Sequence, residues 1–214
     1  RDAASAPAGR IRLAAPMSFG VTNIAPVIAE FLAQHPGIEI ELSLSDARVD
    51  IVAEGYDIAL RIAELPDSSL RARRLCTIRT HIVAAPRYLE TNGTPTHPAQ
   101  LGEHKLFGYS NVVGPWRFHG PGGAEVSVRV HGPLTANSGE AIMPALVAGL
   151  GIARLPDFII ETCLASGALT TILCDWAPAP IGLHLLTPPS PLRPARVEAL
   201  IEFLTRRLRD PLPA

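Results

Sequence analysis

The sequence of 214 residues lacks several features that would assign it directly to a class of proteins. Aromatic residues make up only 5% of it, and the formal net charge is −1. A near-neutral balance argues against a strongly basic nucleic-acid module in this stretch of chain. The uncharged apolar runs fall short of the roughly 20 residues that a membrane-spanning helix needs. We therefore expect these residues to contact neither nucleic acid nor a membrane.

Cysteine is scarce, and its pattern is not that of a disulfide framework. The three cysteines, Cys76, Cys163 and Cys174, are an odd number at wide spacing without a CxxC pair. This favours reduced, mostly buried thiols in a cytoplasmic protein. The alternative is a redox sensor built on Cys163 and Cys174, although nothing nearby in the sequence indicates a lowered thiol pKa.

Motifs for catalysis, metal ions and cofactors are missing as well. The seven histidines show no HxH or HExxH spacing, which argues against a metal site. There is no P-loop, no GxSxG and no evident pair of catalytic carboxylates. The stretch nearest to a dinucleotide-binding motif follows a predicted helix and has Arg154 in place of the last glycine. We predict no enzyme activity, no metal and no cofactor.

What the sequence does contain is a regular alternation of strand and helix signals. Hydrophobic residues make up 47%, enough for a substantial core. The first third predicts strands at 10–15, 38–44 and 57–62. An apolar stripe predicts a helix from Ile24 that Thr22 or Asn23 caps, and Asp46 is expected to cap a short helix through Glu54. Short strand–helix–strand connections are typical of a parallel α/β sheet.

The remaining two thirds are less regular but give similar signals. Strands are predicted at 75–85, 105–110, 115–119, 125–130, 152–155, 169–173 and 181–187. Helices are predicted at 86–92, 98–104, from Ser138 to Ala148, and from Asp157 to about 165. The last predicted helix places apolar residues on one face, namely Val197, Leu200, Ile201, Leu204 and Leu208.

Five phrases in order make the sequence resemble the effector-binding (regulatory) domain of LysR-type transcriptional regulators. They are GRIRLAAPMSFG (9–20), EFLAQHPGIEIELSLSD (30–46), VDIVAEGYDIALRIAELPDSSLRARRL (49–75), VAAPRYLETNGTPTHPAQL (83–101) and GLGIARLPDFI (149–159). The resemblance covers about Gly9 to Arg209. One departure is Ile62-Ala63-Glu64, where the subgroup with RIGxLPDSSL has Ile-Gly, and this change affects the expected pocket floor.

The resemblance implies an α/β fold of the type II periplasmic-binding-protein-like kind, with two α/β subdomains joined by two crossover strands. We expect a linker stub at 1–9, subdomain I at 10–82 and 188–214, and subdomain II at 83–187. In the family a winged helix-turn-helix precedes this domain. Because the chain begins at Arg1 rather than Met, we expect that DNA-binding part to lie upstream.

Effector-binding residues are expected where strands end at the cleft between the subdomains. In subdomain I, Ser18 is the strongest candidate, although it also suits helix capping, and Phe19 suits either stacking on an effector or sealing the core. Ser45 follows the second strand. The end of the third strand contributes Arg61, Ile62 and Ala63. Arg61 suits a ligand carboxylate, but a solvated rim or a salt bridge with Asp57, Glu64 or Asp67 is the simpler interpretation.

In subdomain II the candidates are Ala84 at the crossing, Asn137 and Ser138 at a helix start, and Leu155 at a strand end. Ordinary N-capping is an equally common use of Asn137 and Ser138. Leu155 would supply an apolar wall. His184 lies in a predicted strand, where a core or edge role is simpler than a ligand role.

Together these observations predict a ligand-sensing and oligomerisation domain that binds a small-molecule effector, an organic anion by our hypothesis. The family implies a homodimer or homotetramer, in which residues 24–34 and 38–44 of one subunit pack against residues 138–148 of its partner. DNA would be contacted only through the upstream domain. A periplasmic solute-binding protein of a transport system is the alternative, and an enzyme on the same fold is a third reading.

Overall fold

The computed structural model describes residues 7–47, 50–63, 71–110, 114–176, 178–190 and 192–208. The chain forms two compact units, the first of residues Arg1–Thr77 and Gly182–Ala214 and the second of Ile78–Ile181. The divisions fall five and six residues before the expected ones at 82 and 187. Each crossing coincides with a strand end, since β4 (Arg71–Ile78) ends and β12 (Ile181–Thr187) begins there.

Unit 1 is built on a five-stranded sheet in the order β2-β1-β3-β12-β4. Strand β1 (Gly9–Ala15) pairs in parallel with both β2 (Ile38–Leu44) and β3 (Ile58–Ile62). This confirms the parallel arrangement predicted for the first third of the chain. Strand β12 returns from unit 2 and pairs antiparallel with β3, so the sheet is mixed.

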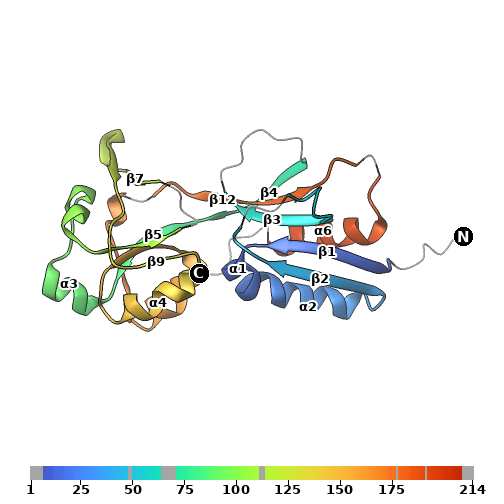
Figure 1. The fold of residues 1–214 in the computed structure, drawn as a ribbon, viewed down its shortest axis with the longest axis horizontal. Helices are drawn as coiled ribbons and strands as arrows, with labels where there is room; N and C mark the ends of the chain where they lie inside the picture. The colour runs from blue at the N-terminus through green and yellow to red at the C-terminus, as the bar shows by residue number, and fades with distance from the viewer. Residues whose placement is uncertain are drawn as a thin grey trace, which may run out of the picture. The chain divides into compact units, whose positions relative to one another are not determined.

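Two helices of unit 1 contact each other through aromatic side chains. The rings of Phe31 in α2 (Ala25–Gln34) and Phe203 in α6 (Ala195–Arg207) lie 5.2 Å apart in an edge-to-face arrangement. Figure 1 shows both helices beside the sheet of unit 1. All five apolar residues of the stripe predicted for the last helix are buried. The periodicity of 3.6 residues therefore identified this helix and its inner face.

The first helix begins earlier than the sequence predicts. Helix α1 (Met17–Phe19) continues through a wider π-helical turn (Gly20–Ile24) directly into α2. Thr22 and Asn23 thus lie inside the helix, and the prediction that either caps it is wrong. In the wider turn the Ala25 N–H donates to the Gly20 carbonyl, five residues back. We attribute the wider turn to Pro26, which has no N–H of its own.

The predicted short helix capped by Asp46 is also wrong. Residues 51–55 form turns, and residues 48–49 lie outside the described part. Asp50 accepts hydrogen bonds from the backbone N–H groups of Val52 and Ala53 at 3.1 and 3.0 Å. Asp50 therefore initiates this turn, because a short acceptor side chain satisfies free N–H groups. The Asp46 carboxylate is used elsewhere.

Unit 2 contains a second five-stranded sheet, in the order β11-β5-β10-β6-β9. These strands are β11 (Thr170–Ile172), β5 (Thr80–Ala84), β10 (Ile152–Pro156), β6 (Leu106–Tyr109) and β9 (Thr135–Ala136). Strand β10 is parallel to β6 and antiparallel to β5. The carboxyl ends of β10, β6 and β9 therefore share one edge of the sheet with the amino end of β5.

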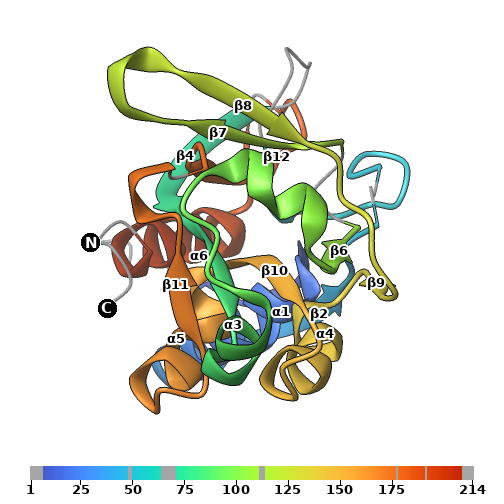
Figure 2. The same ribbon diagram turned by 90° about the vertical axis from the view of Figure 1, so that its left-hand side faces the viewer.

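Different elements cover the two faces of this sheet. Helices α4 (Gly139–Val147) and α5 (Asp157–Ala165) pack on one face over Val83, Phe107 and Leu155 (Figure 2). The other face is covered by the antiparallel ribbon of β7 (Trp116–His119) and β8 (Glu125–Val128). Short 3-10 turns at Pro98–Glu103 and Cys174–Trp176 and helix α3 (Pro86–Asn92) also contribute side chains to this face, and a third such turn, Pro121–Gly123, joins β7 to β8.

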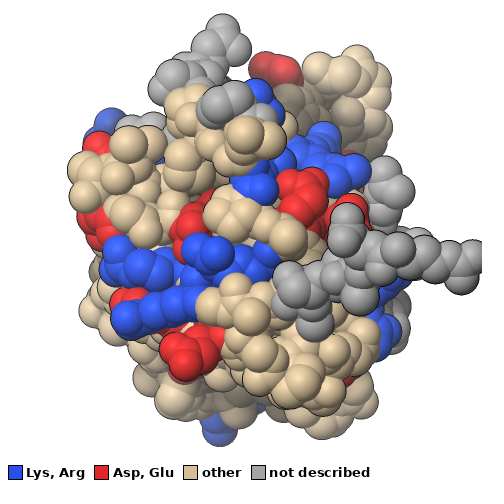
Figure 3. Space-filling model, turned by 90° about the vertical axis from the view of Figure 1, so that its right-hand side faces the viewer, with Lys and Arg blue, Asp and Glu red and all other residues tan. Residues whose placement is uncertain are grey.

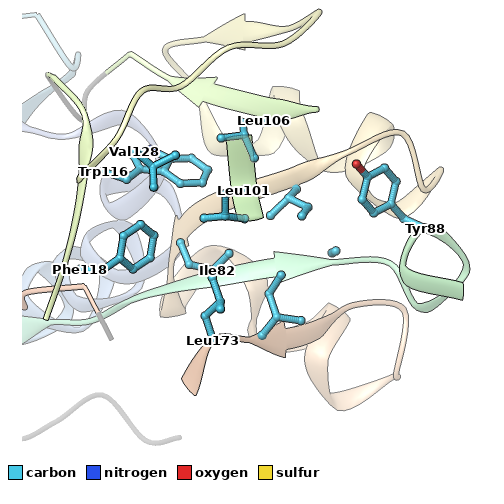
Figure 4. Packing of buried hydrophobic residues seen from close by; sticks show 11 residues of the cluster. Ile82, Tyr88, Leu101, Leu106, Trp116, Phe118, Val128 and Leu173 are labelled. Atoms are coloured by element: carbon cyan, nitrogen blue, oxygen red, sulfur yellow. The ribbon is translucent and has the colours of Figure 1, made fainter. Parts of the chain in front are cut away.

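The larger core of unit 2 lies between the sheet and the ribbon. Trp116, Phe118 and Val128 from the ribbon point toward Ile82 and Leu101, and all five are buried (Figure 4). Burial of large aromatic side chains supplies much of the stabilisation of such a core, about 25 cal/mol per Å² of apolar area removed from water. The ribbon is thus an integral part of unit 2.

Charges on the described surface are mixed. Figure 3 shows a band of Lys and Arg side chains with Asp and Glu beside it. Arg10 and Arg12 pair with Glu41, and Arg207 pairs with Glu30. None of the described helices is long and apolar enough to cross a membrane. Cys76 and Cys163 are half-buried and Cys174 is exposed, so the expectation of mostly buried thiols is met only in part.

Candidate functional site

The first candidate region of unit 1 is the start of helix α1. Ser18 is 2% exposed and Phe19 is fully buried. The Asp46 carboxylate accepts a hydrogen bond from the Met17 N–H at 3.1 Å. The first free N–H of this helix, next to the candidate Ser18, is therefore held by a carboxylate of the chain itself. The burial of Phe19 agrees with the core role that the sequence left open.

Ser45 stands just after β2 and makes a local turn. Its Oγ accepts from the Ala47 N–H at 3.1 Å, and its own N–H donates to the Ala15 carbonyl at 3.0 Å. The side chain is exposed. The Ala15 contact places Ser45 at the carboxyl ends of β1 and β2, next to the start of α1. Ser45 and Ser18 thus border the same edge of the unit 1 sheet.

The end of β3 brings Arg61, Ile62 and Ala63 beside β12. Arg61 lies opposite His184 and Ile62 opposite Leu183 in the antiparallel register. The Ala63 N–H donates to the Gly182 carbonyl at 3.1 Å. Directly opposite residues share a face, so the Arg61 and His184 side chains lie on the same side of the sheet.

Of the three salt-bridge partners considered for Arg61, the structure describes only Asp57. The Asp57 carboxylate accepts from the Arg12 backbone N–H at 2.8 Å. Glu64 and Asp67 lie outside the described residues. The register places Arg61 opposite His184 and decides neither for nor against a salt bridge. A ligand role for Arg61 therefore stays a prediction.

His184 is a feature of unit 1 that the sequence reading undervalued. Its Nε2 lies 2.4 Å from where a Cβ on Gly182 would stand, so the ring occupies space that only glycine leaves. Partial burial and then the positive charge of Arg74 lower the pKa of His184, and the backbone of Ala63 opposes this. The end of β3 and β12 thus presents an imidazole held near two arginines, Arg74 and Arg61.

In unit 2, Asn137 and Ser138 follow β9 directly. The Ser138 Oγ accepts from the Ala141 N–H at 3.4 Å and donates to the Glu140 carboxylate at 2.8 Å. This confirms Ser138 as the N-cap of α4. Ser138 thus has a structural task, and any ligand contact would come in addition to it.

Leu155 and Ala84 are both core residues. Leu155 is fully buried in the cluster that α4 and α5 cover. Ala84 pairs with Ile152, at the opposite end of β10 from Leu155. The sheet therefore brings Asn137, Ser138 and Leu155 to one edge and places Ala84 at the other.

The residue that sequence reasoning missed in unit 2 is Arg154. It is 7% exposed, one residue before Leu155 on β10, and its Nε donates to the Thr80 Oγ1 at 2.9 Å. Burial lowers its pKa. The signal was present, since Arg154 interrupts an otherwise apolar strand, IARLP, but we considered it only as a mismatch to a glycine motif.

No group of described residues has the three or more His, Cys, Asp or Glu side chains needed to hold a metal ion. What the two sheets present instead are hydroxyls and cationic groups near strand ends. Hydroxyls and cationic groups suit binding of a small polar or anionic molecule. Together with the fold, they place the chain in the class of ligand-binding α/β domains with two units.

The comparisons with known proteins agree with that class. The family model described as the LysR substrate binding domain matches residues 4–209. An uncharacterized HTH-type transcriptional regulator of Haemophilus influenzae is 36% identical over 181 residues, which are 84% of this chain and 63% of that protein. PtxR of Pseudomonas aeruginosa is 32% identical over 213 residues, 99% of this chain and 68% of that protein.

Solved structures give the same result. The full-length virulence activator AphB of Vibrio cholerae matches with a TM-score of 0.84 and 30% identity, over 94% of this chain and 69% of that one. The regulatory domain of CrgA from Neisseria meningitidis matches with a TM-score of 0.81 and 28% identity, over 94% of this chain and 100% of that one.

The chain therefore belongs to the family of LysR substrate-binding domains, and its fold is the two-subdomain α/β fold of the type II periplasmic-binding-protein-like kind. It spans 63% and 68% of the length of the two regulators compared above. The resemblance drawn from the five sequence phrases is confirmed.

Proposed function

We propose that this chain is the sensor part of a cytoplasmic LysR-type transcriptional regulator and binds a small-molecule effector between its two units. The observation that carries the proposal is the family match over residues 4–209. The relatives named as transcriptional regulators support it. The polar residues at the strand ends of each unit, Ser18, Ser45, Arg61, Asn137 and Ser138, are the proposed contacts.

The mechanism requires that the effector favour one arrangement of the two units over another. A ligand that bound both arrangements equally would shift nothing. In the proposed regulator, DNA is bound by an upstream winged helix-turn-helix. A homodimer or homotetramer built on α2 and β2 of one subunit against α4 of the next would pass the change on to that domain.

The effector is proposed to be a small organic acid. The argument is chemical, since Arg61 in unit 1 and Arg154 in unit 2 are cationic groups beside proposed contacts. The start of α1 adds nothing to this argument, because Asp46 already satisfies its first N–H.

Screening a metabolite library by thermal shift tests the proposal. Ligand binding to the folded state raises the melting temperature in proportion to the logarithm of ligand concentration over Kd. We expect one or a few small acids to stabilise the domain without being turned over. Stabilisation by neutral or cationic compounds alone would contradict the organic-acid proposal, and chemical conversion of the hit would favour an enzyme instead.

A further inference from the structure

Arg154 is a buried cation on the face of the unit 2 sheet that carries the larger apolar core. In the register of β10 and β5 it lies directly opposite Ile82, and Thr80 lies opposite Pro156. Because alternate residues of a strand share a face, Arg154 has Ile152, Ile82 and Thr80 on its own side. Both isoleucines belong to the apolar cluster shown in Figure 4.

The charge of Arg154 has no counter-charge within the unit. None of the ion pairs among described residues includes Arg154. The residues of unit 2 outside the described part are Asn111, Val112, Val113 and Ala177, none of which is acidic. A cation removed from water without a carboxylate partner is costly, which is consistent with the lowered pKa.

The hydrogen-bond donors around Arg154 outnumber the acceptors. A guanidinium has five N–H donors, and the described residues accept only the one on Nε, through Thr80 Oγ1. Thr80 is 5% exposed, and with its oxygen accepting from Arg154 its own proton is left to donate. No described residue accepts the Thr80 hydroxyl proton.

The terminal nitrogens of Arg154 remain reachable from solvent. Among described residues, the only fully enclosed side-chain nitrogen or oxygen without a partner is the Nε of Arg193. The two terminal nitrogens of Arg154 also lack hydrogen-bond partners, but they are not fully enclosed. They therefore keep contact with solvent although the residue is only 7% exposed. An entering anion can therefore meet them.

We propose that Arg154 and Thr80 form the carboxylate anchor of a small organic acid in unit 2. This rests on the proposed function and deepens it, because it assigns the acid group to β10 and β5 rather than to the start of α1. The planar fork of Arg154 matches the two oxygens of a carboxylate, and the Thr80 hydroxyl donates to one of them. The apolar neighbours favour a weakly hydrated organic acid over inorganic phosphate.

The test observes Arg154 itself. We would follow the side-chain Nε–H resonance of Arg154 by NMR while adding benzoate or acetate at millimolar concentration. The neutral amides benzamide and acetamide, and inorganic phosphate, serve as comparison ligands. The signal is assigned by its loss in Arg154→Lys. We expect the carboxylates to shift it in a saturable way and the amides to leave it unchanged.

Variants provide the second readout. Arg154→Met is expected to weaken carboxylate binding at least tenfold, Arg154→Lys and Thr80→Val less, and Arg117→Met, at an exposed arginine of the same unit, not at all. An unmoved Nε–H signal, an equal response to amides or phosphate, or unchanged affinity in Arg154→Met would each overturn the proposal. Those results would not contradict effector binding found by the library screen. The proposed anchor at Arg154 and Thr80 and the proposed function are therefore tested independently.

Discussion

The fold clearly lowers the pKa values of Arg154 and His184. They lie in different units and on different strands, β10 and β12. Desolvation is the leading cause for both, and His184 also feels the positive charge of Arg74. Side chains with shifted pKa values indicate functional sites when the local geometry also points to a ligand. At Arg154 that geometry is the set of N–H donors without acceptors.

An uncompensated buried charge should reduce the stability of the ligand-free protein. We predict that Arg154→Met raises the free energy of unfolding by about 1 kcal/mol, or roughly 2–4 °C in melting temperature for a chain of this size. Arg117→Met should leave it unchanged. Thermal unfolding without ligand measures both. A clear loss of stability in Arg154→Met would mean that the arginine has a structural role.

The lowered pKa of His184 predicts a pH dependence. Because the folded-state pKa lies below the unfolded value of 6.5, the unfolded chain takes up a proton more readily. The contribution of His184 to stability is therefore complete above pH 6.5 and is lost as the pH falls through the folded-state pKa. His184→Gln should remove this part of the acid destabilisation, as measured by urea unfolding across that range.

Arg74→Met is the matched variant for this effect. Removing the neighbouring positive charge should raise the pKa of His184, which an NMR titration of its ring reports directly. The rise should be partial, because the larger cause, burial, remains. A ring pKa that does not change in Arg74→Met would contradict the electrostatic coupling between these two strands.

At this scale, sequence reasoning found residues with local tasks and missed those that depend on distant partners. Ser138 was expected as an N-cap and is one, because capping is decided within one turn of chain. Arg154 was missed because its significance depends on Thr80, which is 74 positions away in sequence. The burial of Phe19 likewise follows from packing that no local pattern encodes.

Among the elements, the start of α1 depends on a carboxylate from another segment. We predict that Asp46→Ala lowers the free energy of unfolding by about 1 kcal/mol, since the Met17 N–H loses its acceptor. Asp46→Asn keeps an acceptor and should cost clearly less. Denaturant unfolding of the two variants checks this, and equal losses would show that the contact with Met17 contributes nothing.

The connection between β8 and β9 depends on a close backbone approach. A Cβ on Gly132 would lie 2.2 Å from the carbonyl oxygen of Leu106, which belongs to the sheet. We predict that Gly132→Ala lowers the free energy of unfolding by about 1–3 kcal/mol, as forced overpacking does. Gly102→Ala, with open space around it, is the control. Equal stability of both variants would contradict this account.

Most elements could be predicted because hydrophobic periodicity is strong in them. Strands β1, β2 and β12 lie within a residue of their predicted bounds, and the apolar stripe predicted for the last helix is buried along α6 and its C-cap. The failures occurred where distant contacts decide the structure. Helix α1 begins at Met17 because Asp46 satisfies its first N–H, and residues 51–55 form turns although their pattern favours a helix.

At the scale of the molecule, two α/β units and a family match define a ligand-binding domain. The five ordered phrases predicted the family and the fold, because they extend along nearly the whole chain. The compact units divide five and six residues before the expected subdomain bounds at 82 and 187. An effector site between the two units stays a proposal.

Amide chemical-shift mapping with a stabilising organic acid tests whether the chain binds its effector between the two units. If the acid binds between the units, saturable shifts should appear in unit 1 around Ser18, Ser45 and Arg61. They should also appear in unit 2 around Thr80, Asn137 and Arg154. Shifts confined to one unit, or scattered over exposed surface without saturation, would contradict the account of this chain as a sensor that closes on its effector.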